Sequence, residues 1–218
     1  SQHWPLHSAM PGMAWPALPR WQAAQKLALL FQFEQQQWRK PDEVIQDQFA
    51  QLRALLAFAA QTVPHYRETL APFAGPSLDE KTWRGLPILT RAALHGAGPT
   101  LRSTRPLKEH GDAFEISTSG STGKVVKVLG NALTNLVYQA CCLRDHLWHR
   151  RVFTDKLLAI RFMGEAAARQ PLGERTQGWG PATDDLMRTG EAVKLHILQD
   201  VPHLAARLAA ENPGYLIG

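Results

Sequence analysis

The residues best suited to chemistry form one run rich in glycine and hydroxyl groups, Thr118-Ser119-Gly120-Ser121-Thr122-Gly123-Lys124. Its two glycines allow a tight turn and a close approach of the backbone to a ligand. Its hydroxyls, its successive backbone N–H groups and the ammonium of Lys124 can together surround phosphate oxygens. The run therefore predicts a loop that binds the phosphates of a nucleotide.

Two other phosphate-binding motifs are excluded by the spacing of this run. The Walker A motif needs a glycine where Thr118 stands and a serine or threonine where Val125 stands. The dinucleotide fingerprint needs three glycines that lead into a helix, whereas Gly120 and Gly123 are followed by a strand-like segment. By composition alone, a flexible Gly-Ser hairpin without a ligand stays open as an alternative.

Thr118–Lys124 resembles the phosphate-binding loop of the adenylate-forming enzymes, the acyl-CoA synthetase and luciferase superfamily. The resemblance is closest to the phenylacetate–CoA ligase branch and its capsule-biosynthesis relatives, and it covers about residues 45–218. Segments on both sides of the loop are similar to that branch in the same order. They are Leu52–Tyr66, Leu86–Thr90, Gly178–Gly180 and Asn212–Gly218.

This resemblance implies an ATP- and Mg²⁺-dependent reaction in two steps, in which a carboxylate forms an acyl-adenylate and a thiol, most often that of CoA, then displaces AMP. The loop would hold the β- and γ-phosphates. Ser119, Ser121 and Thr122 would donate hydrogen bonds from hydroxyls, Gly120 and Gly123 from backbone N–H groups, and Lys124 from its ammonium. The acid is expected to be a small carboxylic acid, with an aromatic acid as one option.

The family's adenine-binding segment, its acidic Mg-linked residue, its ribose-binding Asp and its catalytic Lys would lie beyond residue 218. We therefore expect the chain to be the N-terminal part of such a ligase, with no catalytic residue of its own and no activity alone. In many members Pro and Lys follow the loop, whereas here Val125 and Val126 precede Lys127. Three alternatives stay open: a non-catalytic nucleotide-binding or interaction module, an enzyme that transfers the acyl group to a carrier protein, and one that transfers it to an amine.

Few other residues are candidates for a site. Trp179 lies in a glycine-rich segment after an expected strand, and it is a candidate wall of the acyl or adenine pocket. His146 and His149 share a helix face, but without a further ligand they predict no metal site. Cys141 and Cys142 lie on an apolar helix, where packing is the expected role.

Composition and charge narrow the class of protein. With 218 residues, 44% hydrophobic and 20% charged, the chain resembles an ordinary globular protein. No apolar run reaches the roughly 18 residues that a membrane span needs, and the first residues lack the pattern of a signal peptide, so we expect no membrane partner. The only two cysteines, Cys141 and Cys142, are neighbours and form no disulfide framework, which predicts a cytoplasmic protein. The net charge is +5, but its basic residues form no stripe with aromatics, so nucleic acid is not an expected partner. The oligomeric state stays open.

The expected fold class is α/β, with three segments. Residues 1–40 form an irregular arm and a first helix, 41–112 a helical and loop region, and 113–218 a nucleotide-binding α/β region truncated at its C-terminal end. Within 113–218, strand, helix and strand alternate, which predicts a parallel sheet and the start of the large N-terminal domain of an adenylate-forming enzyme. The expected strands are 115–117, 125–129, 156–162, 192–198 and one from 215 onward, with helices over 133–149 and 201–211.

Two apolar stripes predict helices in the first half of the chain. In the helix expected over 20–38, the stripe comprises Trp21, Ala24, Leu27, Phe31 and Trp38. In the helix expected over 41–63, it comprises Ile45, Phe49, Leu52, Leu56, Ala59 and Val63. Short helices such as 90–95 are expected between 72 and 112. In the proline-rich arm, Trp4 and Trp15 are expected to pack on the body of the protein.

Overall fold

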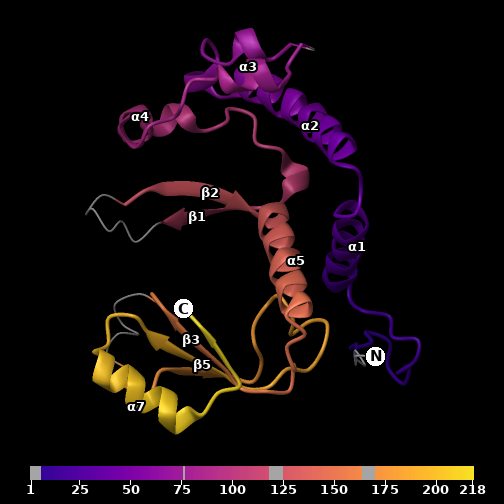
Figure 1. Cartoon of the computed structure of the whole chain (residues 1–218), viewed down its shortest axis with the longest axis vertical. Helices are drawn as coiled ribbons and strands as arrows, with labels where there is room; N and C mark the ends of the chain where they lie inside the picture. Colours follow the sequence, from indigo (N-terminus) through magenta and orange to yellow (C-terminus); the bar gives the residue numbers. More distant parts are fainter. Residues whose placement is uncertain (1–5, 76, 118–124, 164–169) are drawn as a thin grey trace. The chain divides into compact units, whose positions relative to one another are not determined.

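The structure, a computed structural model, describes residues 6–75, 77–117, 125–163 and 170–218. By its contacts the chain divides into two compact units, Ser1–Gln32 with Ala132–Gly218, and Phe33–Asn131. The helices are α1 (Trp21–Gln36), α2 (Pro41–Thr62), α3 (Glu80–Arg84), α4 (Arg91–Ala97), α5 (Ala132–Trp148) and α7 (Val201–Glu211). The strands are β1 (Ala113–Ser117), β2 (Lys127–Asn131), β3 (Leu157–Arg161), β4 (Glu174–Thr176), β5 (Ala192–His196) and β6 (Tyr215–Ile217) (Figure 1).

The first unit contains a four-stranded sheet in the order β4-β5-β3-β6. Strands β3, β5 and β6 are parallel, and β4 is an antiparallel edge strand on β5. The chain leaves β5, forms α7 and returns as β6 on the other side of β3, so the predicted parallel strand-helix-strand arrangement is confirmed. The fold is therefore mixed α/β, while its assignment to the adenylate-forming domain stays a prediction.

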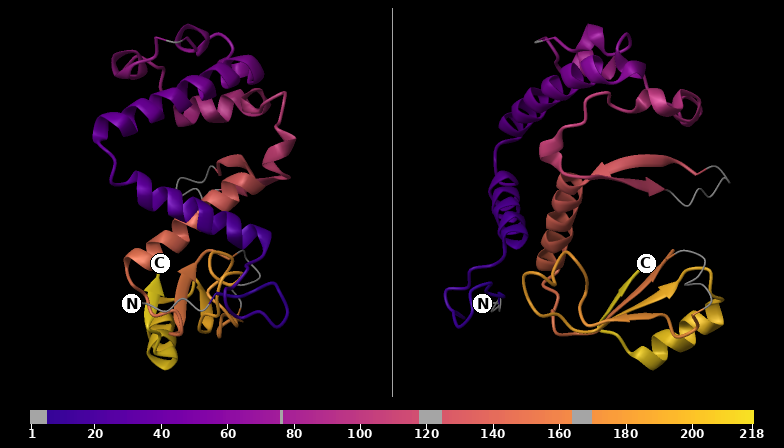
Figure 2. Two further views of the ribbon diagram at one scale, coloured as in Figure 1. Left: turned by 90° about the vertical axis from the view of Figure 1, so that its right-hand side faces the viewer. Right: turned by 180° about the vertical axis from the view of Figure 1, so that it is seen from behind.

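Both faces of this sheet carry buried apolar clusters, which explains the continuous apolar run Leu157–Ile160 in the central strand β3. On one face, Leu158, Val193 and Leu195 are buried against α7 through Leu204 and Leu208. Figures 1 and 2 show α7 along that face. On the other face, a second cluster contains Leu157, Trp179 and Ala192. Because neighbouring strand residues point to opposite faces, alternate residues of β3 and β5 belong to alternate clusters.

Helix α7 has defined signals at both ends. The Asp200 carboxylate caps its N-terminus by accepting a hydrogen bond of 2.7 Å from the backbone N–H of His203. Pro202 lies in the first turn, where its missing N–H is not needed. Asn212, with φ of 43° and ψ of 58°, ends the helix in the left-handed conformation.

Helix α1 buries a different face from the predicted one. Ala23, Lys26 and Leu30 are buried, whereas Trp21 is 76% exposed. Polar contacts of Lys26 explain this buried face. Its ammonium forms an ion pair with Asp185 and donates a hydrogen bond of 2.6 Å to the carbonyl of Pro181. Because a buried lysine needs such partners, α1 presents the face with Lys26 to the segment 181–187. A pattern of apolar residues alone does not predict this.

The arm before α1 is joined to the same segment by backbone contacts. Leu6 forms a bridge with Met187, and the N–H of His7 donates to the carbonyl of Leu186 at 2.7 Å. The prediction that Trp15 packs on the body is wrong, because its side chain is 89% exposed. Trp4 lies outside the described residues.

In the second unit, the predicted stripe of α2 is largely confirmed. Leu56 is buried with Leu70 and Leu78, and Phe49, Leu52 and Ala59 pack against this cluster. Ile45 is the exception, since it is 44% exposed. Short helices and turns fill 64–110, as expected, and α4 is capped by the Thr90 hydroxyl, which accepts from the N–H of Ala93.

Two differences concern strands. β2 begins at Lys127 and not at Val125, and it continues through Gly130 and Asn131. β4 lies between the strands expected over 156–162 and 192–198, where no strand was expected. Its three residues, Glu-Arg-Thr, are too few and too polar to show a strand period, and they are held in place by pairing with β5. The three segments expected from the sequence stay a prediction.

Candidate functional site

The predicted phosphate-binding run, Thr118–Lys124, lies outside the described residues. The strands on both sides of it are described, and they pair as an antiparallel two-stranded sheet, which Figure 2 shows from two directions. The register places Ser117 opposite Lys127, and residues 118–126 join these two positions. The run therefore connects two paired strands, as the sequence predicted for its flanks.

Side chains of the hairpin contact one another across the two strands. The Lys127 ammonium lies 2.8 Å from the Glu115 carboxylate. Gly130 stands opposite Phe114, and a Cβ at this position would lie 2.9 Å from Cζ of the Phe114 ring. The ring therefore covers the space that glycine leaves open. The charge of Lys127 is therefore already paired within the hairpin, with Glu115.

The described residues contain no group of three His, Cys, Asp or Glu side chains that could hold a metal ion such as Mg²⁺. We therefore assign Mg²⁺ to no residue of the described chain. His149, one of the two histidines considered above, lies 3.4 Å from the Asp145 carboxylate.

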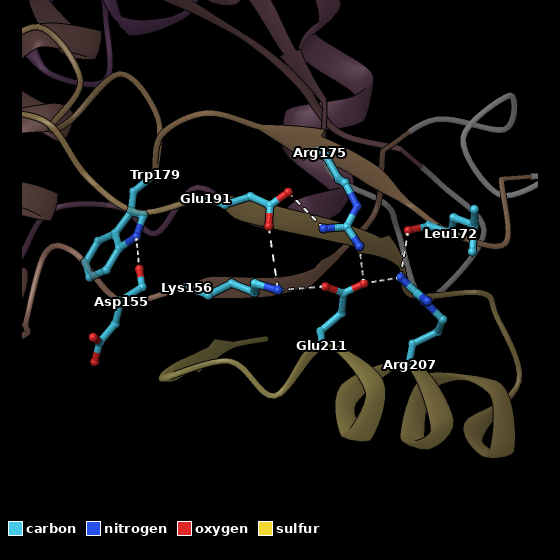
Figure 3. A network of polar contacts seen from close by, with 8 residues as sticks. All are labelled: Asp155, Lys156, Leu172, Arg175, Trp179, Glu191, Arg207 and Glu211. Atoms are coloured by element: carbon cyan, nitrogen blue, oxygen red, sulfur yellow. Dashed lines mark hydrogen bonds and ion pairs between the residues drawn. The ribbon is translucent and has the colours of Figure 1, made fainter.

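Trp179 lies in an aromatic cluster beside the amino ends of β3 and β6. Its ring centroid is 5.3 Å from that of His146, 5.4 Å from Phe153 and 5.5 Å from Tyr215. Its indole N–H donates to the carbonyl of Asp155 at 2.9 Å (Figure 3). The side chain is only 9% exposed. These contacts give Trp179 a packing role, and its place in a substrate pocket stays a prediction.

His146 is the titratable member of this cluster. Burial, together with the charge of Arg151, lowers the pKa of its imidazole from 6.5 to about 4, against a weaker opposite effect of Asp145. The Arg151 guanidinium lies 2.6 Å from Nδ1 of the ring. As Arg151 can only donate, Nδ1 is the acceptor. Burial of His146 was not predicted, because a histidine interrupts the pattern of apolar residues along α5.

A network of charges surrounds the buried carboxylate of Glu211 at the end of α7 (Figure 3). It pairs with Lys156 at 3.1 Å, with Arg175 and with Arg207. Burial alone would raise the pKa of Glu211, but the hydrogen bond from Lys156 and the three positive charges lower it. Glu191 adds a second carboxylate, 2.8 Å from Arg175. The network joins the end of α7 to β4 and to the residues directly before β3 and β5, which gives it a structural role.

The second unit contains an open apolar cavity of about 510 Å³. It lies between α2 and the segment 84–89, where Leu56, Tyr66, Trp83 and Ile88 are among its lining residues. Arg84 is its charged residue, and its guanidinium is paired with Glu80 at 2.5 Å.

The carboxyl ends of β3 and β5 carry two polar residues that belong to no sequence motif. Arg161 ends β3 and His196 ends β5, and the two are register partners. In open parallel sheets this edge is the usual place of ligand sites. The one sequence signal for these two residues is their position at the end of an expected strand. A single histidine or arginine is common at such a position, so this signal does not distinguish a ligand site.

No protein-family model, curated protein or solved structure matches this chain. No helix in the described part of the chain is both long and apolar enough to cross a lipid bilayer.

Proposed function

We propose that this chain is the N-terminal part of an ATP-dependent, AMP-forming ligase that activates a carboxylic acid, and that Thr118–Lys124 binds the phosphates of ATP. The observation that carries the proposal is the run itself, set between two strands that pair antiparallel with Ser117 opposite Lys127. A turn rich in glycine and hydroxyl groups between paired strands presents backbone N–H groups to an anion.

The chemistry follows from this assignment. An oxygen of the substrate carboxylate attacks the α-phosphorus of ATP, the bond to the bridging oxygen breaks, and pyrophosphate leaves. A thiol then attacks the acyl carbon and AMP leaves, with CoA as the expected thiol. The loop holds the β- and γ-phosphates so that the leaving group is in line with the attacking oxygen and its charge is compensated. Mg²⁺ supplies further compensation of that charge.

Exchange of labelled pyrophosphate into ATP, measured with a panel of carboxylic acids, tests the proposal in the enzyme that contains this chain. Gly123→Val places a branched side chain where the backbone must approach phosphate, so exchange should fall strongly. Ser121→Ala removes one hydroxyl donor to a charged group, worth about 1.5 to 3 kcal/mol, and should have a smaller effect. Lys127→Gln is the matched control, because Lys127 is paired with Glu115 and should be nearly neutral.

Full exchange activity in Gly123→Val would contradict the assignment of the loop. Binding of ATP without exchange for any acid would instead favour the non-catalytic nucleotide-binding module. For an active enzyme, mass spectrometry of products formed with CoA, a carrier protein or an amine identifies the acceptor. The chain of 218 residues alone is expected to give no exchange.

A further inference from the structure

The carboxyl edge of the sheet in the first unit brings two donor side chains to one face. Arg161 and His196 are register partners on the neighbouring parallel strands β3 and β5. Side chains of register partners point to the same face. Val193 and Leu195 pack on α7, so His196, one residue after Leu195, lies on the opposite face together with Arg161.

His196 has a buried donor without an acceptor. Its side chain is fully buried, and its Nδ1 accepts a hydrogen bond of 3.1 Å from the backbone N–H of Leu198. The ring hydrogen therefore lies on Nε2. Nε2 is buried and has no hydrogen-bond partner among the residues that the structure describes. Buried N–H groups are nearly always paired, and an exception indicates a missing partner such as a ligand.

Arg161 supplies a charge beside this donor. Its side chain is exposed, and in the described part of the chain no ion pair involves its guanidinium. It lies close enough to Tyr138 of α5 for its charge to act on the phenol. That charge opposes the hydrogen bond with Cys142, which is the main reason that the pKa of Tyr138 is raised. Arg161 therefore places a positive charge on the strand beside the one that ends in the buried imidazole.

Apolar side chains form the rest of this surface. The Phe162 ring lies edge-on to His196 with 5.2 Å between the ring centroids, yet 57% of the residue is exposed. Leu198, two residues after His196, is 72% exposed. The Phe162 ring is thus a partly exposed cover on the imidazole, and the apolar surroundings suit the hydrocarbon part of a ligand.

We propose that Arg161 and His196 form a binding site for the carboxylate of a small organic acid, entered when the Phe162 ring turns aside. The guanidinium contributes one positive charge and a fork of donors, which matches a singly charged carboxylate. Nε2–H of His196 donates to the second oxygen. One fixed cation favours a carboxylate over a doubly charged phosphate. The site requires no ATP, so a test of it is independent of the proposed function.

Nuclear magnetic resonance of the ¹⁵N-histidine-labelled chain tests this site, with the His196 imidazole as the probe. The chain is titrated with benzoate, and separately with benzamide, its uncharged analogue, with inorganic phosphate and with ATP and Mg²⁺. We expect benzoate to shift the His196 Nε2 signal in a saturable way, with benzamide and phosphate at least about tenfold weaker. ATP should leave this signal unchanged, whatever it does to Thr118–Lys124.

Two variants separate binding from folding. Arg161→Gln changes an exposed side chain, so the chain should melt like the wild type but bind benzoate about tenfold more weakly. Phe162→Ala removes the cover and should bind benzoate at least as well as the wild type. The proposal is overturned if benzoate leaves the His196 signal unchanged in both wild type and Phe162→Ala. It is also overturned if Arg161→Gln binds benzoate as tightly as the wild type, or if phosphate binds as tightly as benzoate.

Discussion

The four-stranded sheet of the first unit and the β1–β2 hairpin of the second unit are held together in different ways. In β5, four of five residues are buried, whereas all five residues of β1 are exposed. The sheet depends on apolar packing against α7 and Trp179. The hairpin depends on contacts between its own strands, Glu115 with Lys127 and Phe114 with Gly130.

This difference indicates where the chain can change shape at small cost. Segments with few buried apolar contacts open with low free energy, and ligand-binding loops belong to such segments. The predicted phosphate-binding run follows β1, in which every residue is exposed, so binding a nucleotide there need not disturb the core. The sheet gives the first unit its stability, and the predictions below separate these two contributions.

The largest effect is expected for Leu158→Ala in β3. Leu158 is fully buried between β5 and α7, so its truncation should lower the free energy of unfolding by about 2 to 5 kcal/mol. Leu129→Ala in β2 is the matched control, since Leu129 is 52% exposed, and it should change stability by only about 0.5 kcal/mol. Urea unfolding measures both, and equal losses would contradict the comparison.

The next effect depends on pH and concerns His146. Its pKa is lowered to about 4 in the folded chain, so the unfolded chain binds the proton first as the pH falls. The neutral imidazole makes its full contribution to the free energy of unfolding above pH 6.5. This contribution is lost as the pH falls from about 6.5 to 4. Each pH unit in this window removes at most about 1.4 kcal/mol, and residual solvent screening reduces that value.

His146→Phe isolates this contribution, because a phenyl ring can pack with Phe153 and Trp179 but does not titrate. Thermal unfolding of wild type and variant is compared between pH 6.5 and 5, above the range in which carboxylates take up most of their protons. The wild type should lose stability faster than His146→Phe across this interval. Parallel pH dependences would show that the imidazole is already hydrated in the folded chain.

A smaller loss is expected when the Glu211 network loses its central charge. Glu211→Gln leaves Lys156, Arg175 and Arg207 without their shared carboxylate, and should destabilise the chain by about 1 to 2 kcal/mol. Because the pKa of Glu211 is lowered, its contribution is present at neutral pH and is lost as the pH falls. Glu191→Gln is the control, since this carboxylate is more exposed, and an equal loss there would contradict a central role for Glu211.

Much of this fold could be predicted because its elements have strong local signals. The apolar run 157–160 and the stripe of α2 predicted their elements, and Asp200, Pro202 and Asn212 define the ends of α7. The buried face of α1 could not be predicted, since Lys26 is buried through partners more than 150 residues away in the chain. β4 was missed for a related reason, because its position depends on pairing with β5.

The candidate site was predictable only in part. Thr118–Lys124 and the strands beside it have a sequence signature, and the pairing of β1 with β2 agrees with it. Arg161 and His196 come together only because β3 and β5 are parallel neighbours in one register, although they are 35 residues apart in the chain (196 − 161). Single residues at strand ends have no spacing pattern that would select them.

The smallest global effect is expected for Gly130→Ala in β2. The added methyl group would meet the side chains of Phe114 and Ile116, which must move away and uncover the hairpin. A two-stranded hairpin has little stability of its own. The change should therefore lower the free energy of local opening of the hairpin by about 1 kcal/mol and leave the unfolding free energy of the four-stranded sheet unchanged. Hydrogen exchange should therefore accelerate at amides of β1 and β2 while those of β3 and β5 keep their rates. If exchange accelerated equally in both regions, the hairpin and the sheet would unfold as one cooperative unit, and the loop could not rearrange independently of the core.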